Sequence, residues 1–437
     1  MPKPVRLLSQ LKSAAPRLPL ARALAPLPQA SRRLLRAVAA QAESSRLPLY
    51  IVGGYVRDVI LGRPSLDLDL VVEGDAIAFG RQLQRALGGE LLAHKTFGTA
   101  VWRLAPGRGL PEFVDLISAR RESYARPGAL PAVQFSNIAD DQFRRDFTIN
   151  TLALRLDGAQ AGQILDAWGG LADLRACVIR VLHDQSFSDD PTRIFRALRF
   201  SGRLGFALER KTQQQLRANV NRLDAVSGER IYNEIDLILQ EPKRVQILAS
   251  LQKYGVLRAI HLKLQWNAAM ARALAHIQKP AKVWGIAPLQ AELGLVVWLA
   301  QHAPTTVEAV ARRLRLTAEL AAAARAASGL RAQARKLAGM PNSALTFTLQ
   351  RAPQLAVYAL YLLQRNTPLA ARLLAYSRRW RSLQPYADGN TLTALGLKPG
   401  KAYGHILQAL RAAWLDGKVK TRKQEAALLE RLLREQY

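Results

Sequence analysis

Residues 49–72 read LYIVGGYVRDVILGRPSLDLDLVV and predict the fold of the front of this chain. An apolar run of strand length, 49–52, meets Gly53 and Gly54, and a short helical stretch follows them. A second apolar strand occupies residues 66–72. Strand, glycine turn, helix and strand in so short a span indicate an α/β domain.

Two carboxylates lie on the second of these strands, because Asp67 and Asp69 are separated by one residue. On a strand, residues i and i+2 point to the same side, so both carboxylates face one spot about 7 Å apart along the chain. Oxygen-ligated Mg²⁺ ions would neutralise the pair. Asp115, in the apolar run 113–117, could complete a three-carboxylate site. The alternatives are a solvent-facing Asp pair and a strand-end Asp bonded to a loop.

The sequence on either side of these strands predicts an α/β domain in the N-terminal part of the chain, the front, and helices in the C-terminal part, the rear. Gly53 and Gly54 lack a Cβ, so backbone N–H groups there can approach phosphate oxygens. A helix over 75–88 and a strand over 99–104 complete the expected front, which ends near residue 180. No strand is predicted beyond Asp189, where apolar residues recur at helical spacing.

Charge is distributed unevenly along the 437 residues, whose net charge is +30. Residues 1–42 hold eight basic and no acidic side chains, residues 43–242 hold 25 of each, and residues 243–437 hold 30 basic against 8 acidic. A neutral front and a strongly basic rear suggest catalysis in one and nucleic-acid binding in the other. No apolar run is long enough to span a membrane, and the single cysteine, Cys177, excludes an intramolecular disulfide framework.

Five segments follow one another along the chain: Val52-Gly53-Gly54-Tyr55-Val56-Arg57-Asp58 with Asp67 and Asp69; Arg144-Arg145-Asp146-Phe147-Thr148-Ile149-Asn150; Asp166 to Leu174 with Gly169, Gly170 and Asp173; Asp189-Asp190-Pro191-Thr192-Arg193 with Arg196, Arg199 and Phe200; and Glu229-Arg230-Ile231. In this order they resemble one family, the class II tRNA nucleotidyltransferases and bacterial poly(A) polymerases, whose catalytic head is related to DNA polymerase beta. A weaker resemblance to the family's tail appears at 389–433.

The resemblance implies a role for each matching position. Asp67 and Asp69 are expected to bind the metal ions, with Asp115 as the third catalytic carboxylate. Residues expected to bind the nucleotide are Gly53, Gly54, Arg57, Arg144, Arg145, Asp146, Asn150, Asp190, Arg193, Arg196 and Arg199. Among them, Gly54 and Arg57 contact the triphosphate, and Asp146 and Asn150 shape the ribose site.

Base selection is expected at Asp190 and Arg193, which stand three apart at a predicted helix start with Pro191 in its first turn. A carboxylate beside a guanidinium can offer hydrogen bonds to the edge of cytosine or adenine, and in the family this pair selects CTP and ATP. The alternative is an N-cap Asp followed by helix-surface arginines. The family usually has Glu where Asp189 stands. This departure leaves open how firmly Arg193 is held for base recognition.

The resemblance thus implies a mixed-sheet nucleotidyltransferase head at 43–178, followed by an all-α neck at 179–242, body at 243–385 and tail at 386–437. Residues 1–42 are predicted to be a basic extension of a cytoplasmic protein. The alternative is that they are a transit peptide, which would direct the protein to an organelle.

The expected activity is Mg²⁺-dependent addition of CCA, from CTP and ATP, to the 3′ end of tRNA, which the basic rear would hold. The segment from His94 to Ala100 is similar to the CCA-adding form of the family. Poly(A) addition, CC-only or A-only addition, and an inactive RNA-binding protein remain alternatives, and the oligomeric state is undetermined.

Overall fold

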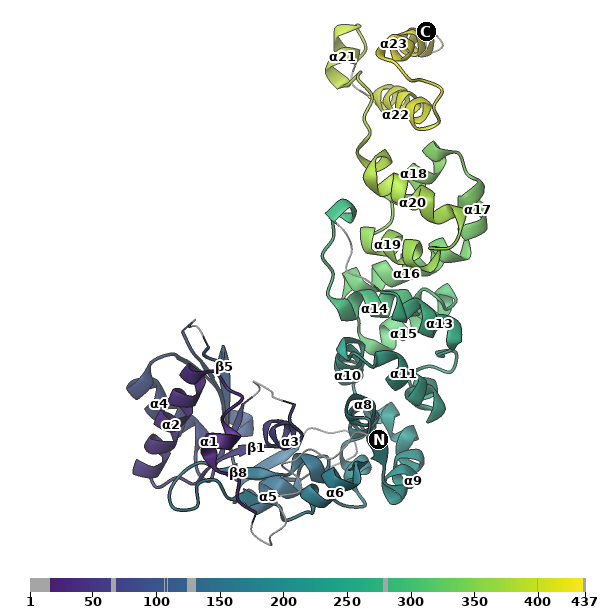
Figure 1. Cartoon of the computed structure of the whole chain (residues 1–437). Helices are drawn as coiled ribbons and strands as arrows, with labels where there is room; N and C mark the ends of the chain where they lie inside the picture. The colour runs from purple at the N-terminus through teal and green to yellow at the C-terminus, as the bar shows by residue number, and fades with distance from the viewer. Residues whose placement is uncertain are drawn as a thin grey trace. The chain divides into compact units, whose positions relative to one another are not determined.

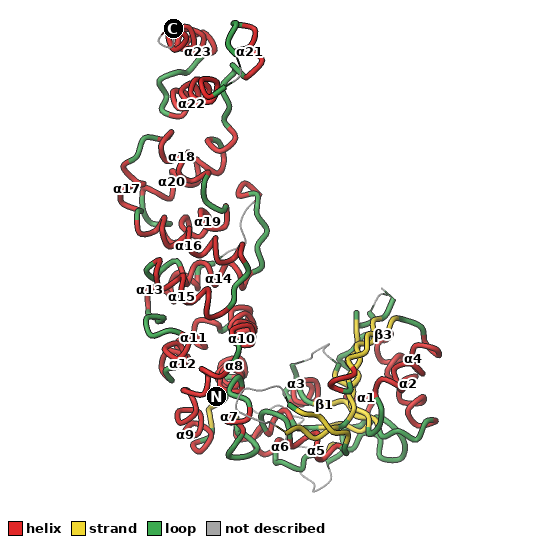
Figure 2. The backbone as a smooth tube through the Cα atoms, turned by 180° about the vertical axis from the view of Figure 1, so that it is seen from behind, coloured by secondary structure: helices red, strands yellow, loops and turns green. Residues whose placement is uncertain are grey.

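The computed structural model of the chain describes residues 16–63, 68–105, 107, 109–123, 131–277, 282–398 and 400–434. The chain divides into two compact units. The first comprises Met1–Arg230 with Lys253–Ala259, and the second comprises Ile231–Gln252 with Ile260–Tyr437. Figure 2 distinguishes the strands of the first unit from the helices of the second. Within the described ranges, no helix is long and apolar enough to cross a membrane.

A seven-stranded mixed sheet forms the centre of the first unit (Figure 1), in the order β3-β4-β5-β2-β1-β8-β9. Only the β2–β5 pair is parallel, and the other neighbours are antiparallel. The strands are β1 (Leu49–Val52), β2 (Asp69–Val72), β3 (Glu90–His94), β4 (Thr99–Arg103), β5 (Phe113–Ser118), β8 (Ala153–Arg155) and β9 (Ile164–Leu165).

Burial explains the two sequence patterns of these strands. All four residues of β1 are buried, which fits its continuous apolar run. In β4 and β5 buried residues alternate with less buried ones, so one face is covered. The covered face carries Trp102 and Leu116, both fully buried, and contacts α4 (Ala76–Leu87), where Gly80 lies against Leu116. Asp75 caps α4 by accepting the N–H groups of the first turn.

The opposite face of the sheet is covered only over its middle. There α5 (Ile138–Phe143) packs through Ile138 against Tyr50, Val71 and Ala153 of β1, β2 and β8. The residues of β3 that point to this face are exposed. This uneven covering leaves an accessible surface on β3–β5 beside the strand that carries Asp69.

The N-terminal residues are part of the head. In α2 (Gln29–Ser44), which follows α1 (Leu20–Ala23), Leu35, Val38 and Ala42 are buried, and the helix packs against α4. The Tyr55 hydroxyl donates to the carbonyl of Ala23. The boundary predicted after residue 42 therefore falls inside a helix and is wrong. Basic composition concealed the buried stripe, because three of every four positions on α2 face solvent or lie half-buried.

The remaining elements of the first unit are short strands and helices outside the seven-stranded sheet. They are η1 (Lys95–Phe97), the hairpin β6 (Arg120–Ser123) and β7 (Ala132–Phe135), η2 (Thr148–Asn150), α3 (Gly54–Ile60), α6 (Gly170–Ala176), β10 (Val178–Ile179), α7 (Ser186–Asp189), α8 (Arg193–Leu204), β11 (Ala207–Leu208), α9 (Arg210–Asn219), η3 (Val220–Ala225) and α12 (Val256–Ile260). The pairing of β11 with β10 corrects the expectation that no strand follows residue 189. A two-residue strand is too short to show periodicity.

In the second unit, every regular element of the described residues is a helix. The elements are α10 (Gly228–Gln240), which crosses the division, α11 (Arg244–Lys253), α13 (Ala268–Ala275), η4 (Lys282–Trp284), α14 (Gln290–Leu299), α15 (Pro304–Leu314), α16 (Ala318–Ala332), α17 (Ala334–Gly339), α18 (Asn342–Gln350), α19 (Gln354–Leu363), α20 (Pro368–Arg378), η5 (Trp380–Ser382), α21 (Gly389–Ala394), α22 (Lys401–Leu415) and α23 (Arg422–Arg434). A mixed-sheet head followed by helices confirms the predicted fold class.

Candidate active site

The central strands bring two predicted carboxylates together. Asp69 opens β2 and is paired in register with Asp115 of β5, 46 residues later. Paired residues on neighbouring strands point to the same face, about 4.8 Å apart. Asp67 lies outside the described residues. Among those described, no three acidic, histidine or cysteine side chains cluster as metal ligands. The two paired carboxylates nevertheless offer the oxygen donors that a hard divalent cation prefers.

Gly53 must be glycine for two reasons. Its φ is +67°, a conformation that L side chains rarely adopt, and a Cβ would lie 2.9 Å from Nη1 of Arg145. The N–H of Gly53 donates to the carbonyl of Leu152, so it is not available to a phosphate. Gly53 and Gly54 both line one cleft of the first unit, so their role in nucleotide binding stays a prediction.

Arg57 follows on α3 and is almost completely buried. Its Nε and Nη2 donate to both carboxylate oxygens of Asp58, at 2.8 and 2.9 Å, and its Nη1 donates to Oδ1 of Asn150 at 2.5 Å. The guanidinium carbon lies 5.1 Å from the centre of the Phe200 ring. A bidentate ion pair and an aromatic face hold the side chain in one orientation.

Arg144 and Arg145 are held by a single buried acid. Asp141 at the start of α5 is fully buried and accepts from Arg144 at 2.6 Å and from Arg145 at 2.8 Å. Burial alone would raise the pKa of Asp141, but the two guanidinium groups outweigh it and lower the pKa. Glu122 also accepts from Arg144, at 3.1 Å. Arg144 and Arg145 are therefore not part of a surface salt-bridge patch, because their side chains are only 13–15% exposed.

Asp146 is the centre of a second network. Its carboxylate accepts from Arg196 at 2.6 Å, from the amide of Asn150 at 2.9 Å and from the backbone N–H of Phe147. Burial raises the pKa of Asp146, but the charge of Arg196, the Asn150 hydrogen bond and the charge of Arg193 prevail and lower it to about 2. Asp146 is consequently an anion at neutral pH.

These networks converge on one cleft of about 420 Å³ in the first unit. Seven arginines line it, a density of positive charge that suits a polyphosphate. All predicted site residues within the described ranges line it except Asp115, which is paired with the lining residue Asp69. The lining residues are Gly53, Gly54, Arg57, Asp69, Glu122, Arg144, Arg145, Asp146, Asn150, Asp190, Arg193, Arg196, Arg199, Phe200 and Arg203.

Known proteins match both the head and the whole chain. Residues 49–180 match the family described as the poly A polymerase head domain, and residues 205–266 match the probable RNA and SrmB-binding site of polymerase A. The A-adding tRNA nucleotidyltransferase of Halalkalibacterium halodurans is 34% identical over 402 residues, which cover 90% of each chain. This chain belongs to the tRNA nucleotidyltransferase family.

Relatives with different products share the fold. The CC-adding tRNA nucleotidyltransferase of Deinococcus radiodurans is 39% identical over 209 residues, which cover 47% of this chain and 54% of that one. The solved CCA-adding enzyme of Thermotoga maritima in complex with tRNA has a TM-score of 0.74 and 26% identity, covering 96% of this chain and 98% of that chain. The family is thus clear, while its members differ in the nucleotides that they add.

In this tRNA nucleotidyltransferase the predicted base-selecting pair differs from expectation. Asp190 is extended and lies before α8, which begins at Arg193, so the two residues do not share a helix face. The Asp190 carboxylate accepts from Thr192 and from Arg230 at 2.8 Å. Arg193 donates to Oγ of Ser186 and to the carbonyl of Arg144, both at 2.7 Å. Both residues still line the cleft, so their role in base selection remains a prediction.

Sequence reasoning missed the residues that hold the cleft together. Asp58, Glu122 and Asp141 orient its arginines, and Arg230 orients Asp190. Arg203 also lines the cleft and lies 3.8 Å from Asp58. The arginine row 193, 196 and 199 continues at helical spacing to 203, so this one could have been found by extension. Asp141 could have been found as well, since it stands three and four residues before Arg144 and Arg145, the spacing of ion pairs on a helix.

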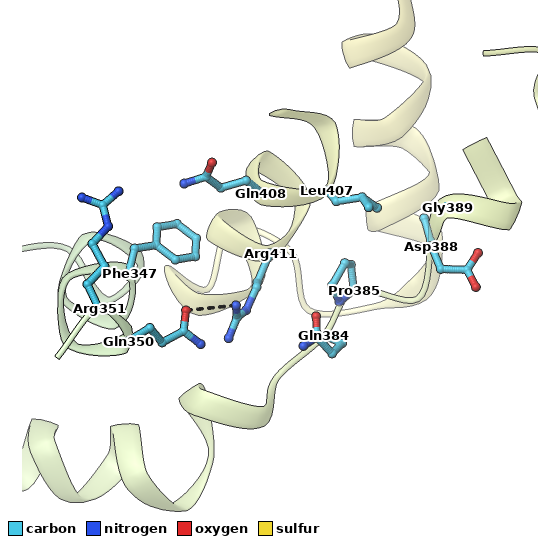
Figure 3. Close-up of a pocket in the computed structure, with 11 residues that line it drawn as sticks. Phe347, Gln350, Arg351, Gln384, Pro385, Asp388, Gly389, Leu407, Gln408 and Arg411 are labelled. Carbon is cyan, nitrogen blue, oxygen red and sulfur yellow. Dashed lines mark hydrogen bonds between the residues drawn. The ribbon is translucent and has the colours of Figure 1, made fainter. Parts of the chain in front are cut away.

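A second cavity, of about 640 Å³, lies in the second unit between α18, α22 and the loop before α21 (Figure 3). Arg411 of α22 donates to Gln350, to the carbonyls of Trp380 and Arg381, and lies 5.7 Å from the Phe347 ring. These contacts tie α22 to α18. Although this cavity is larger than the cleft, Asp388 is the one acid lining it, so it lacks the paired carboxylates of the cleft.

Asp146→Asn is expected to change the acid stability of the protein. The folded pKa of Asp146, about 2, is below its unfolded value, so its contribution is present above pH 4 and is lost as pH falls towards 2. That contribution is about 2 kcal/mol at pH 6. Urea unfolding of wild type and variant at pH 6 and pH 3 measures it. The gap between them should narrow at pH 3, and an unchanged gap would contradict the lowered pKa.

Proposed function

We propose that this tRNA nucleotidyltransferase adds the terminal adenosine to the 3′ end of tRNA, using ATP and no nucleic-acid template. The proposal is supported by the Halalkalibacterium relative, an A-adding enzyme that matches 90% of the chain. One structural observation carries the chemistry: Asp69, Asp190 and seven arginines, Arg193 among them, line the same cleft. A metal-binding carboxylate, polyphosphate-binding groups and the two residues proposed to read the base can therefore act in one nucleotide-sized space.

The second candidate is the addition of the whole CCA sequence from CTP and ATP. Its support is the Thermotoga CCA-adding enzyme, which covers 96% of the chain, together with the segment from His94 to Ala100 that is similar to CCA-adding forms. CC-only addition is supported by the Deinococcus relative, whose match covers 47% of this chain, and poly(A) addition by the description of the head family. These products differ in the nucleotides accepted, while the chemical step is the same.

The residues of the cleft divide the work of nucleotidyl transfer. The arginines bind and orient the triphosphate, and Arg57, Arg144 and Arg145 are held in place for this by Asp58 and Asp141. Asp190 and Arg193 present hydrogen-bonding groups to the base. The RNA 3′-oxygen then attacks the α-phosphorus, and pyrophosphate leaves.

A divalent cation fits the carboxylates at the centre of the head. Asp69 and Asp115 would hold it, with Asp67 completing the set, and we take the ion to be Mg²⁺ because all donors are carboxylate oxygens. Bound there, the ion would supply Lewis-acid stabilisation of the charge that develops at the phosphate. The carboxylates themselves position the reacting end of the RNA beside the arginine-lined cleft.

Residues 243–437, with a net charge of +22, are proposed to hold the tRNA through its phosphates. We also propose a cytoplasmic enzyme. Removal of residues 1–42 as a transit peptide would cut α2 and delete Leu35 and Val38 from the head. A cleavable leader is normally dispensable to the folded domain, whereas these side chains are buried in it.

Three tRNA substrates separate the candidates: tRNA lacking all of CCA, tRNA ending in the first C, and tRNA ending in CC. Each is incubated with CTP or ATP singly and together, and the products are sequenced. An A-adding enzyme extends only the tRNA ending in CC, by one adenosine. Extension of all three to CCA would establish the second candidate, and repeated adenosine addition would indicate a poly(A) polymerase.

A further inference from the structure

One face of strands β3, β4 and β5 is only partly covered beside the paired carboxylates. The register forms a continuous row across four strands: Asp69 pairs with Asp115, Asp115 with Val101, and Val101 with Leu92. Residues paired in this way point to the same face of the sheet. A straight line of side chains therefore leads from the carboxylates to the edge strand β3.

A second row runs beside the first. Phe113 pairs with Arg103, and Arg103 with Glu90, each two residues from a member of the first row and so on the same face. Phe113 is 46% exposed and Leu92 49% exposed, and Arg103 is exposed as well. We call Leu92, Val101, Arg103 and Phe113 the open-face patch.

Exposure of the patch does not come from a frayed edge of the sheet. Trp102 and Val114, which alternate with patch residues on the same strands, are fully buried on the other face, which α4 covers. The strands are thus firmly packed from behind. An exposed aromatic ring and an exposed aliphatic side chain on such strands form a preformed surface, which costs little ordering when a ligand binds.

Sheet order places the cleft and the patch on opposite sides of Asp69. The cleft residues Gly53, Gly54 and Arg57 follow β1, which neighbours β2 on one side, whereas the patch lies on β5, β4 and β3 on the other side. Nucleotidyl transfer needs two substrates at the same carboxylates. Because Arg57 binds the triphosphate on the β1 side in this proposal, we expect the RNA end to approach from the side of the patch.

We propose that the open-face patch holds the unpaired 3′-terminal nucleotides of the acceptor RNA, with Phe113 stacking on a base and Arg103 contacting a phosphate. An aromatic face and a nearby cation are how proteins bind single-stranded nucleic acid without reading its sequence. Glu90, opposite Arg103 on the edge strand, repels phosphate and limits the patch there. This proposal rests on the proposed nucleotidyl transfer to RNA and adds the place where the RNA end lies.

The test uses the full-length enzyme and measures KM for tRNA and KM for the nucleoside triphosphate separately. Phe113→Ala and Arg103→Ala should each raise KM for tRNA, by about tenfold for the loss of one stacked base, while KM for the nucleotide changes less than about twofold. Phe113→Trp, which keeps an aromatic face, should retain KM for tRNA near the wild-type value. Leu87→Ala is the matched control, since Leu87 is 41% exposed on α4, away from this face.

Two results would overturn the proposal: an unchanged KM for tRNA in Phe113→Ala and Arg103→Ala, or an equal rise in both KM values. An unchanged nucleotide KM in the variants shows that the head is folded. If wild-type enzyme adds no nucleotide to any tRNA, the proposed function fails instead. The two failures are therefore distinguishable, because the first requires an active wild type.

Discussion

Nucleotide addition should fall by about a thousandfold or more when Asp69 is replaced with alanine, the upper end for removing a group that stabilises transition-state charge. Asp69 lines the cleft and is paired in register with Asp115. Its loss removes a donor at the reacting atoms and leaves the basic residues 243–437 unchanged. The rate of single-nucleotide addition and the Kd for tRNA, measured on the same preparation, test this separation. Asp67→Ala is expected to behave in the same way.

Asp184→Ala serves as the control, because Asp184 is an exposed acid of the same unit that pairs with Lys211 outside the cleft. This variant should add nucleotides at close to the wild-type rate. Near-normal turnover in Asp69→Ala would remove the carboxylate site from the mechanism. A weakened Kd for tRNA in Asp69→Ala, equal in size to the loss of rate, would instead make the residue part of the RNA-binding surface.

Arg193→Ala is expected to relax discrimination against UTP and GTP by about two orders of magnitude, roughly 3 kcal/mol, while slowing ATP addition less. Arg193 is 5% exposed, and its contacts with Ser186 and the Arg144 carbonyl use two of its five N–H groups. The other N–H groups of Arg193 remain available to donate hydrogen bonds to the base. A buried polar site rejects a wrong base by leaving its own groups unpaired, so truncation abolishes that penalty.

The measurement is single-nucleotide incorporation with all four nucleoside triphosphates, wild type against variant, on the tRNA that the wild type extends. Arg203→Ala is the matched control, because Arg203 lines the same cleft but its side chain is 43% exposed. Its Nη2 comes no closer than 3.8 Å to Oδ2 of Asp58. This variant should reduce rates for all nucleotides alike. If Arg193→Ala also loses rate equally for every nucleotide and still refuses UTP and GTP, then Arg193 has a structural or phosphate-binding role.

Much of the head could be predicted from local patterns. The predicted strand over 49–52 coincides with β1, the predicted helix over 75–88 with α4, and the helical rear with the described helices of the second unit. Edge strands were missed. β3 alternates between exposed and half-buried residues, and its apolar side chains give no period that distinguishes it from a loop.

Contacts between distant residues were beyond sequence reasoning. The pairing of Asp69 with Asp115 and the burial of Leu35 in the head each join segments that no local periodicity connects. Asp190 lies outside α8, and its carboxylate accepts locally from the N–H and the hydroxyl of Thr192. It also accepts from Arg230, 40 residues away, a partner that the local helix-start pattern could not reveal.

The sequence by itself determined the main order of elements, the family and most of the residues that line the cleft, because strand, turn and helix preferences act over a few residues and the motifs lie within such spans. Only the tertiary structure decided that Asp69 pairs with Asp115, that Glu122 lines the cleft, and which face of β3–β5 stays open beside Asp69. Those outcomes depend on sheet order and register, which are set by the packing of the whole head. The open face exists because α5 packs over the middle of the sheet, up to Ile117 of β5, while β3 and the residues Arg103 and Phe113 are exposed on that side.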